Sequence, residues 1–529
     1  MLFYKLCVRA ALGASILGAT ACTTLGPDFE TPPADLEAVW NEHGQSLNTA
    51  ALSADWWSLF DDPVLDSLIE SAYRQNLSLQ IAGLRIFEAR AQLGVAIGQQ
   101  YPQNQQLNGN LTRVELSENA PNFFPGLMDD RYTQAGIGLD ASWELDFWGR
   151  YRRGVESAGA GLGASIAEYD NALVSLTAEV ARTYVVLRTL EERLVIARSN
   201  TVTQTRGYKL AQARFDNGAV SELDPAQALS LLKSTESTLP QLESRIRQAR
   251  YALSILLGLP PGDLQAILQG GGLIPQPPAA LDVGVPADLL RRRPDIRRAE
   301  LQAAAQSALI GVARTDLYPR FSLVGSIGVL GSDSNSTELN DLFSADSLTY
   351  NFGPSVSWNI LNYGRVQNQV RVQDARLEAA LVNYQNKVLE AAREVEDGLS
   401  SYVGGRAQSE YLAESVQAAQ RAVDLALLQY REGAVDYQRV LDTQKNLLQV
   451  QDAYTSVRGE VVGALISVYK ALGGGWQIRA GKPFVSEQRQ KAMRERTDWG
   501  HLLDESMPGE LPAAPATGAG QPLLNAPDW

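Results

Sequence analysis

The chain has 529 residues, of which 45% are hydrophobic and 20% charged, so it can bury a large core and does not have the composition of a disordered protein. Its formal net charge is -14, and the acidic and basic residues are interspersed along the sequence. This balance excludes nucleic acid as an expected partner, because phosphates bind to basic surfaces.

The N-terminus has the pattern of an export signal. Lys5 and Arg9 precede an apolar stretch of about a dozen residues, which is too short to cross a bilayer. Small residues then lead to Cys22, where a bacterial lipoprotein signal places its acylated cysteine. The alternative is ordinary cleavage beside an unmodified cysteine, because Ala19 stands where such signals more often have leucine. We expect residues 1–21 to be a lipoprotein signal peptide and Cys22 to carry lipid.

The rest of the chain repeats its landmarks at a fixed spacing of 215 residues. The pairs are Gly149-Arg150 and Gly364-Arg365, Gly218-Ala219-Val220 and Gly433-Ala434-Val435, and Leu257-Gly258 and Leu472-Gly473. A spacing held over three landmarks indicates an internal two-fold duplication. We therefore expect an anchor segment at 22–61, a first repeat at 62–258, a linker rich in proline and glycine at 259–286, a second repeat at 287–475 and a partly disordered tail at 476–529.

Each repeat holds two stretches that alternate between apolar and polar residues, as strands with two different faces do. The stretches are 107–111 and 137–147 in the first repeat, and 321–329 and 350–360 in the second. Apolar residues on one face with Asp, Ser and Asn on the other are typical of a membrane β-barrel with a water-filled lumen, and a half-buried soluble sheet is the alternative. Because four strands cannot close a barrel and lipid does not tolerate open sheet edges, a barrel would need several chains.

Aromatic residues lie at or near the ends of two of these stretches. They are Trp143, Phe147, Trp148 and Trp358. Aromatic side chains in this place are typical of the girdle that a membrane barrel forms where lipid meets water, so we expect these four residues to form one.

Each pair of strands is followed by a long helical pattern. Apolar residues recur at steps of three and four from Ile166 to Leu194 and again from Leu381 to Tyr402. No proline interrupts residues 149–217, so a single helix of roughly 100 Å is feasible at about 1.5 Å per residue. Residues 222–257 and 437–472 can supply return helices. A soluble coiled coil is one interpretation, and the strands favour a helical tube that continues a β-barrel.

Several motifs connect the chain with a known family. They are Gly26-Pro27-Asp28-Phe29, Trp56-Trp57 with Phe60 and Asp62-Pro63, the run from Trp143 to Arg150, Pro286-Ala287-Asp288-Leu289-Leu290 with Arg293-Pro294-Asp295-Ile296, and Tyr318-Pro319. In this order and spacing, nearly the whole mature chain resembles the outer membrane factors, the TolC-like and OprM-like exit ducts of tripartite pumps. The resemblance implies an α+β fold: a membrane-anchored trimer with four strands per chain in a twelve-stranded β-barrel, continued by a long periplasmic α-helical barrel with a mixed equatorial belt.

The resemblance also implies partners and a docking site. The partners are two further copies of the chain, outer membrane lipid, a periplasmic adaptor protein and an inner-membrane transporter of the RND type. The adaptor is expected at the turns that close the two helical hairpins, which contain Gly218, Ala219, Val220, Gly433, Ala434 and Val435. The two glycines follow long helices, where a left-handed cap is common, and a turn at the far end of a tube is accessible.

An aperture is expected near the same turns. Asp442 resembles the acidic position that lines the constriction in the family, and three copies of it would form an anionic ring. Arg439 stands where some relatives carry an acid, and Asp224, at the matching position of the first repeat, is its candidate partner. The alternative is that both are solvated helix charges.

The expected function is that of an outer membrane exit channel of a tripartite efflux pump, a passive conduit that opens at its periplasmic tips on docking. The outer membrane component of a type I protein secretion system is the alternative, and a structural coiled-coil surface lipoprotein would not need the four strands. Catalysis is not expected, since the two histidines, His43 and His501, have no metal-ligand spacing and the sequence holds no P-loop or serine elbow. We therefore expect no cofactor and no metal.

Overall fold

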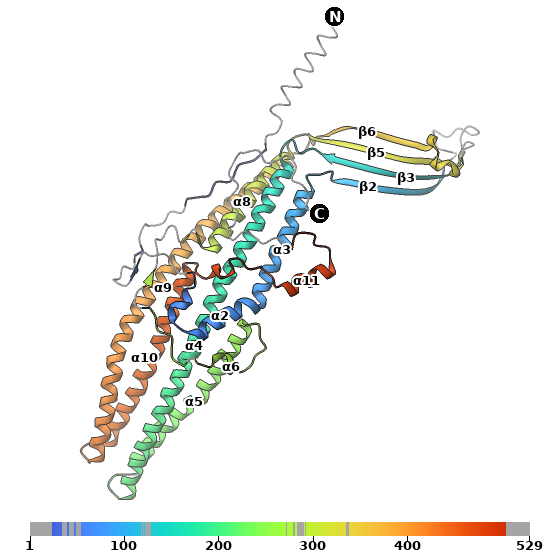
Figure 1. Ribbon diagram of the computed structural model, residues 1–529. Coiled ribbons are helices and arrows are strands. Elements are labelled where there is room, and N and C mark those ends of the chain that lie inside the picture. Colours follow the sequence, from blue (N-terminus) through green and yellow to red (C-terminus); the bar gives the residue numbers. More distant parts are fainter. Residues whose placement is uncertain are drawn as a thin grey trace.

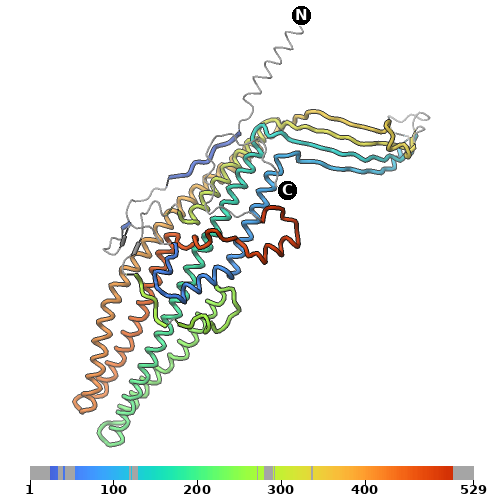
Figure 2. The backbone as a smooth tube through the Cα atoms, viewed as in Figure 1, coloured from blue at the N-terminus to red at the C-terminus, as the bar shows by residue number. Residues whose placement is uncertain are grey.

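The computed structural model describes residues 24–33, 40–41, 47–48, 54–117, 119, 121, 129–270, 272–278, 281–282, 290, 292–334 and 338–503. These residues form an elongated body of helices that ends in two turns, with a sheet projecting from its other end (Figure 1). Figure 2 shows the two helical hairpins, coloured green and orange, running side by side along this body. Cys22 and the tail after residue 503 lie outside the described residues, so the expectations for them stay predictions.

Four helices form the body. α4 (Arg150–Asp216) and α9 (Arg365–Arg431) have 67 residues each, and α5 (Leu223–Leu256) and α10 (Tyr437–Ala471) return beside them. At about 1.5 Å per residue, a helix of this length spans roughly 100 Å. The prediction of two long helices, each with a shorter return helix, is confirmed.

In the half of the body nearest the sheet, α3 (Leu77–Gly98) packs beside α4, and α8 (Pro294–Thr315) packs beside α4 and α9 (Figure 1). Shorter elements surround the middle of the body. They are η1 (Trp56–Phe60), α2 (Pro63–Gln75), α6 (Gln265–Leu268), η4 (Trp476–Arg479) and α11 (Glu487–Arg496), together with the parallel strands β1 (Leu47–Asn48) and β4 (Leu281–Asp282). α2 begins where the Asp62 carboxylate accepts hydrogen bonds from the first free N–H groups of the helix. The main apolar core lies at this level, with Trp56 stacked on Tyr469 at 5.3 Å between ring centres.

The projecting sheet is antiparallel, with strand order β2-β3-β5-β6. Its strands are β2 (Asn104–Glu115), β3 (Arg131–Glu144), β5 (Arg320–Ser332) and β6 (Leu348–Ser357), and η2 (Leu339–Phe343) and η3 (Ala345–Ser347) lie between the last two. The pairing of β3 with β5 joins the two halves of the chain in one sheet. All four predicted strands are therefore present.

Two of the strands end earlier than the alternating pattern predicts. β3 ends at Glu144, and the Asp146 carboxylate accepts hydrogen bonds from the first N–H groups of α4. Gly149, with a φ of 77°, then turns the chain from the sheet into the helix. β6 ends at Ser357, before Trp358, and Gly364, with a φ of 81°, turns the chain into α9. Phe147 and Trp358 therefore lie in the connections between sheet and helices, because the helix starts compete with the strands for these segments.

The described part of the C-terminal segment, 476–503, packs against the body. Arg479 forms a buried ion pair with Asp170 of α4, with 2.9 Å between Nη2 and Oδ2. Arg90 of α3 donates a hydrogen bond to the Leu502 carbonyl oxygen at 2.6 Å. These contacts fix the segment across α3 and α4, as Figure 1 shows in red.

Candidate functional site

The predicted docking residues close the two hairpins at the far end of the body (Figure 1). Gly218 follows α4 with a φ of 70°, and Gly433 follows α9 with a φ of 77°. In each turn the N–H of the next residue, Ala219 or Ala434, donates to a carbonyl oxygen five residues earlier, which is the bond of a Schellman cap. The predicted left-handed caps are confirmed, and both alanines are exposed.

Four side chains just behind the turns tie the two hairpins together. Tyr430 of α9 donates a hydrogen bond to Asp224 of α5, with 3.0 Å between the two oxygens. Arg214 of α4 donates to the carbonyl oxygen of Tyr430 and places its guanidinium 4.7 Å from the centre of that ring. Tyr437 of α10 packs edge-on against Tyr430, at 5.0 Å between ring centres. We call these four residues the tip cluster.

The tip cluster has an apolar base of its own, separate from the main core. Its buried members besides the two tyrosines are Ala211, Ala228, Leu231, Ala426, Val440 and Leu441, and half-buried Val435 packs on them. Burial raises the pKa of the Tyr430 hydroxyl well above its usual value, and the hydrogen bond to Asp224 raises it further. Tyr430 therefore stays a hydrogen-bond donor throughout the neutral pH range.

The predicted aperture residues lie on α10 directly after the second turn. Asp442 is exposed and accepts a hydrogen bond at 2.9 Å from the side chain four residues before it. Arg439 is also exposed, and its backbone N–H donates to Asp436, which caps the helix. Within the single chain Asp224 is engaged by the tip cluster. Its pairing with Arg439 stays a prediction for neighbouring chains, as does the anionic ring of Asp442.

Sequence reasoning places Asp224 near the aperture but misses Arg214, Tyr430 and Tyr437. A signal exists for the two tyrosines, which occupy buried positions of otherwise apolar helix stripes, where a hydroxyl needs a partner. The partner itself depends on how one hairpin packs on the other. No local pattern contains that information.

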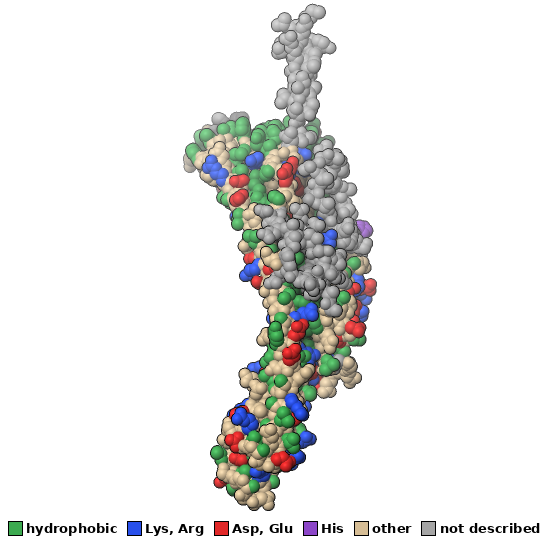
Figure 3. Space-filling model, turned by 90° about the vertical axis from the view of Figure 1, so that its left-hand side faces the viewer, with side chains coloured by type: hydrophobic (Ala, Val, Ile, Leu, Met, Phe, Trp, Pro, Cys, Tyr) green, Lys and Arg blue, Asp and Glu red, His purple; other side chains and the backbone are tan. Residues whose placement is uncertain are grey.

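At the opposite end, the sheet has one apolar and one polar face. Residues paired across the four strands form an apolar row of Leu107, Leu139, Ile327 and Tyr350, and all are exposed in the single chain. The neighbouring row, on the other face, is Gln106, Asp140, Ser326 and Asn351. Among the described residues, no α-helix covers either face (Figure 1), and Figure 3 shows hydrophobic side chains gathered at this end of the molecule. The predicted alternation is confirmed.

The four predicted girdle residues lie where the sheet meets the helices. Three of them donate an indole N–H to a backbone carbonyl oxygen: Trp143 to Gln100 at 3.0 Å, Trp148 to Pro319 at 2.8 Å and Trp358 to Leu317 at 3.0 Å. Phe147 packs edge-on against Phe321, at 5.2 Å between ring centres. Their contact with the lipid–water interface stays a prediction.

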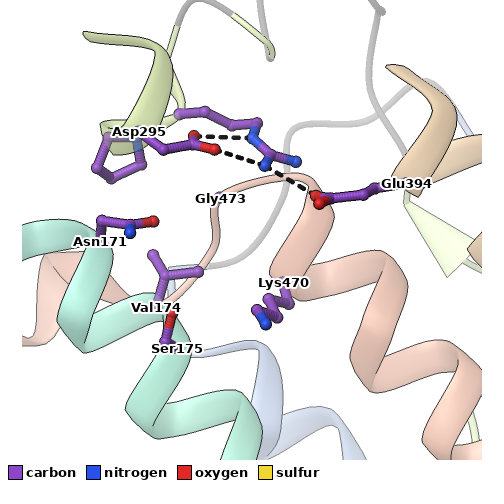
Figure 4. A pocket seen from close by; sticks show the side chains of 9 residues that line it. Asn171, Val174, Ser175, Asp295, Glu394, Lys470 and Gly473 are labelled. Carbon is purple, nitrogen blue, oxygen red and sulfur yellow. Dashed lines mark hydrogen bonds and ion pairs between the residues drawn. The ribbon is translucent and has the colours of Figure 1, made fainter. Parts of the chain in front are cut away.

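A polar cavity of about 180 Å³ lies where α4, α8, α9 and α10 meet (Figure 4). Buried Arg293 donates there to Asp295 at 2.8 Å, to Glu394 at 2.8 Å and to the Ala471 carbonyl oxygen at 2.6 Å. Burial alone would raise the pKa of Asp295, but the hydrogen bonds and charge of Arg293 lower it below its usual value. These bonds hold α8, α9 and the end of α10 together, which is a structural role.

The described residues contain no group of three or more His, Cys, Asp or Glu side chains placed to hold a metal ion. Of the helices in the described ranges, none is both long and apolar enough to cross a membrane.

Comparison with known proteins identifies the family. A profile of the family described as outer membrane efflux protein matches residues 68–259 and 285–474. The chain belongs to this family. It is 33% identical over 466 residues to the pyoverdine export outer membrane protein OpmQ of Pseudomonas aeruginosa, covering 87% of this chain and 96% of the relative. It is 30% identical over 464 residues to the toluene efflux pump outer membrane protein TtgI of Pseudomonas putida, covering 86% and 96%.

The solved structure of the outer-membrane channel OprN is similar with a TM-score of 0.77 at 32% identity, covering 86% of this chain and 100% of that one. The expected family, the place in the outer membrane and the role in efflux transport are thus confirmed. The family is one of transport proteins.

Proposed function

We propose that three copies of this outer membrane efflux protein form one duct, in which their sheets close a twelve-stranded β-barrel. The observation that carries the proposal is the sheet itself: its apolar face is bare, and its outer strands β2 and β6 each pair on one side only within the described chain. In lipid every backbone polar group needs a partner, so both edges require strands of other chains. The polar face would then line a water-filled lumen.

The two halves of the chain support a duplicated architecture. α4 and α9 have equal lengths, and the family profile matches the chain twice. We assign the repeats to residues 62–258 and 287–475, joined by the linker 259–286, with the anchor segment 22–61 before them and the periplasmic tail 476–529 after them. In the trimer the long helices would form a helical barrel that continues the β-barrel into the periplasm.

The segment after Cys22 supports a lipid anchor. The Leu25 N–H donates to the carbonyl oxygen of Trp148 at 3.1 Å. Arg153, buried at the start of α4, holds Asp28 with 2.7 Å between Nη2 and Oδ1. These contacts fix the chain at the junction of sheet and helices, only three residues after Cys22. An acyl chain on that cysteine would enter lipid beside the aromatic girdle.

The hairpin tips are the proposed gate and docking site. Their exposed glycine–alanine turns let another protein approach the backbone closely, and Val220 and Val435 are half-buried beneath them. The tip cluster holds the second hairpin against the first, so its release would free α9 and α10 to move and widen an aperture lined by Asp442. A periplasmic adaptor would bind the turns, and an RND-type transporter in the inner membrane would supply the energy.

The duct is proposed to be a passive conduit for small molecules. By name, OpmQ exports pyoverdine and TtgI belongs to a toluene efflux pump. Cargo this different is expected for ducts that contact it loosely. Both names favour small-molecule efflux over protein secretion for this chain as well.

The mass and outline of the detergent-purified protein test the trimer. Light scattering should give three chains, each of 57.5 kDa less its signal peptide, and negative-stain images should show particles well over roughly 100 Å long. Tyr350→Asp on the apolar face should abolish assembly, whereas Asn351→Asp on the polar face should not. Compact monomers of the wild-type protein would overturn the shared barrel.

A further inference from the structure

The apolar stripe by which α4 packs against α10 is interrupted in its lower part. Toward the sheet, the buried residues of this stripe are apolar: Leu187, Leu190, Leu194 and Ala197. The next buried positions toward the tips are Asn200, Gln204 and Gly207, and an apolar residue follows only at Ala211. On α10, Gln451 accepts a hydrogen bond from Asn200, and Gln444 lies beside Gly207. We call these five residues, Asn200, Gln204, Gly207, Gln444 and Gln451, the polar seam. It separates the main core from the base of the tip cluster.

Two glutamines of the polar seam lack hydrogen-bond partners. Gln204 and Gln444 are each 2% exposed, and within the described residues neither the amide nitrogen nor the oxygen of either one is bonded. A buried amide without a partner is unfavourable, so these atoms require a small ligand that can both donate and accept. Water meets this requirement, because it makes two to four hydrogen bonds at buried polar sites.

Farther from the tips than the polar seam, α10 packs tightly between α4 and α9. A Cβ at Gly459 of α10 would overlap the Thr189 hydroxyl of α4. Cβ atoms at Gly405 and Gly398 of α9 would stand only 2.9 Å and 2.8 Å from valine side chains of α10. Helices packed this closely interlock and resist separation. The contact of Gly459 with Thr189 is therefore the last interlocked backbone contact before the polar seam begins. Between the two, the Arg193 guanidinium of α4 holds the Asp452 carboxylate of α10 through hydrogen bonds of 2.7 Å and 3.0 Å.

We infer that the polar seam binds internal water and is the hinge line along which the lower part of the α9–α10 hairpin separates from α4, with the Gly459–Thr189 contact as its pivot. The inference rests on the proposed gate and adds where its movement starts. Separation at the polar seam exposes amides that water already solvates, so it sacrifices little apolar burial. Separation at the main core would expose many apolar side chains.

Polar residues between helices can instead specify their register. Asn200 and Gln451 fit that role, since they bond to each other at 2.7 Å. Gln204 and Gln444 do not fit it, because neither amide is bonded to the facing helix within the described chain. Unbonded amides define a hydration site and not a register device.

Hydrogen–deuterium exchange of the full-length protein in detergent tests the hinge. Backbone amides of residues 440–455 should exchange at least about tenfold faster than those of residues 459–470. Gln204→Leu combined with Gln444→Leu should dry the polar seam and slow exchange of 440–455 by about tenfold, because apolar groups can replace an unsatisfied polar pair without loss of stability. Gln449→Leu, at an exposed position of α10, is the matched control and should change nothing.

Equal exchange of the two segments in the wild-type protein would overturn the hinge, as would undiminished exchange of 440–455 in the double variant. If the double variant assembles poorly, the exchange of residues 440–455 is measured in each single glutamine variant instead. A measurement of channel current in bilayers tests the proposed duct independently of the hinge. A protein that shows the exchange contrast but never conducts would refute the duct and keep the hinge, whereas a conducting protein with uniform exchange would do the reverse.

Discussion

α4 and α9 have equal lengths and matching places in the two halves of the chain, yet their surroundings differ. Of 67 residues in each helix, 25 are buried in α4 and 13 in α9. α4 passes through the middle of the molecule and packs against α2, α3, α5, α8 and α10, whereas α9 packs mainly against α8 and α10. The same helical pattern thus occurs in a helix at the centre of the molecule and in a helix at its periphery.

This difference identifies the surface that another chain would cover. Val382 and Leu389 are exposed on α9, whereas Ala167 and Val174, at the matching positions of α4, are buried. In the proposed trimer, a neighbouring chain would cover these apolar residues of the second repeat, whose counterparts in the first repeat are buried within the chain. Matched positions of this kind allow the two helices to be compared by mutation.

The largest contrast is expected between Ala167→Asp and Val382→Asp. Ala167 is 0% exposed, so an aspartate there would overfill a closely packed site, bury a charge and lower the free energy of unfolding by about 4 kcal/mol or more. Val382 is 55% exposed, so its variant should keep the fold of the single chain within about 0.5 kcal/mol and lose the proposed trimer. Urea unfolding and light scattering measure the two effects. If both variants unfold alike, α9 is not an interface helix.

At the tips, Gly433→Trp should block efflux while trimers stay intact. The position is exposed with a φ of 77°, so tryptophan adds bulk to the docking surface at a strain of about 1–2 kcal/mol. Gly218→Trp tests whether the turn of the first hairpin is equally necessary for efflux. Gly481→Trp, at an open left-handed position of the C-terminal segment, controls for strain alone. Normal drug resistance of cells carrying Gly433→Trp would defeat the docking assignment.

The sequence predicts some parts of the molecule much better than others. The strands, the long helices and the glycine caps depend on residues close together in the chain, and alternation, heptad spacing and Gly218 and Gly433 predict them. The tip cluster depends on Arg214 meeting Tyr430, which stands 216 residues later, through the packing of two hairpins. The order of 476–503 likewise depends on contacts with distant residues of α3 and α4. Contacts between residues so far apart produce no periodic pattern in the sequence.

A smaller effect is expected where α10 is held most tightly. Gly459→Ala would force α10 away from α4 and lower the free energy of unfolding by about 1–3 kcal/mol, because its Cβ overlaps the Thr189 hydroxyl. Thr189→Ala removes that hydroxyl and should restore part of the loss in the double variant. Gly463→Ala, where a Cβ meets nothing within 4 Å, is the control on the same helix. Denaturant unfolding measures the four variants and the wild-type protein, and strictly additive effects of Gly459→Ala and Thr189→Ala would rule out the tight contact.

The smallest effect is expected at Tyr430. The matching residue of the first half is Phe215, which has no hydroxyl, so only the second hairpin is tied through this position. Tyr430→Phe removes one hydrogen bond to a carboxylate and should weaken the closed tip by about 1–2 kcal/mol, which raises channel current in bilayers several-fold. Tyr411→Phe changes an exposed tyrosine of the same helix and should leave the current unchanged.

The same hydroxyl should make the closed tip sensitive to alkali. Burial, and then the hydrogen bond to Asp224, raises the pKa of Tyr430 above the ordinary tyrosine value of 10.0. A group whose pKa is raised in the closed state stabilises that state fully below about pH 10 and loses this contribution as the pH rises through its higher value. Channel current should therefore be constant from about pH 6 to 9 and rise above about pH 10. In Tyr430→Phe the increase in current above about pH 10 should be smaller. The remaining increase would come from Tyr437, because burial raises the pKa of its hydroxyl too. A rise of equal size in both proteins would show that Tyr430 is not the alkali-sensitive group.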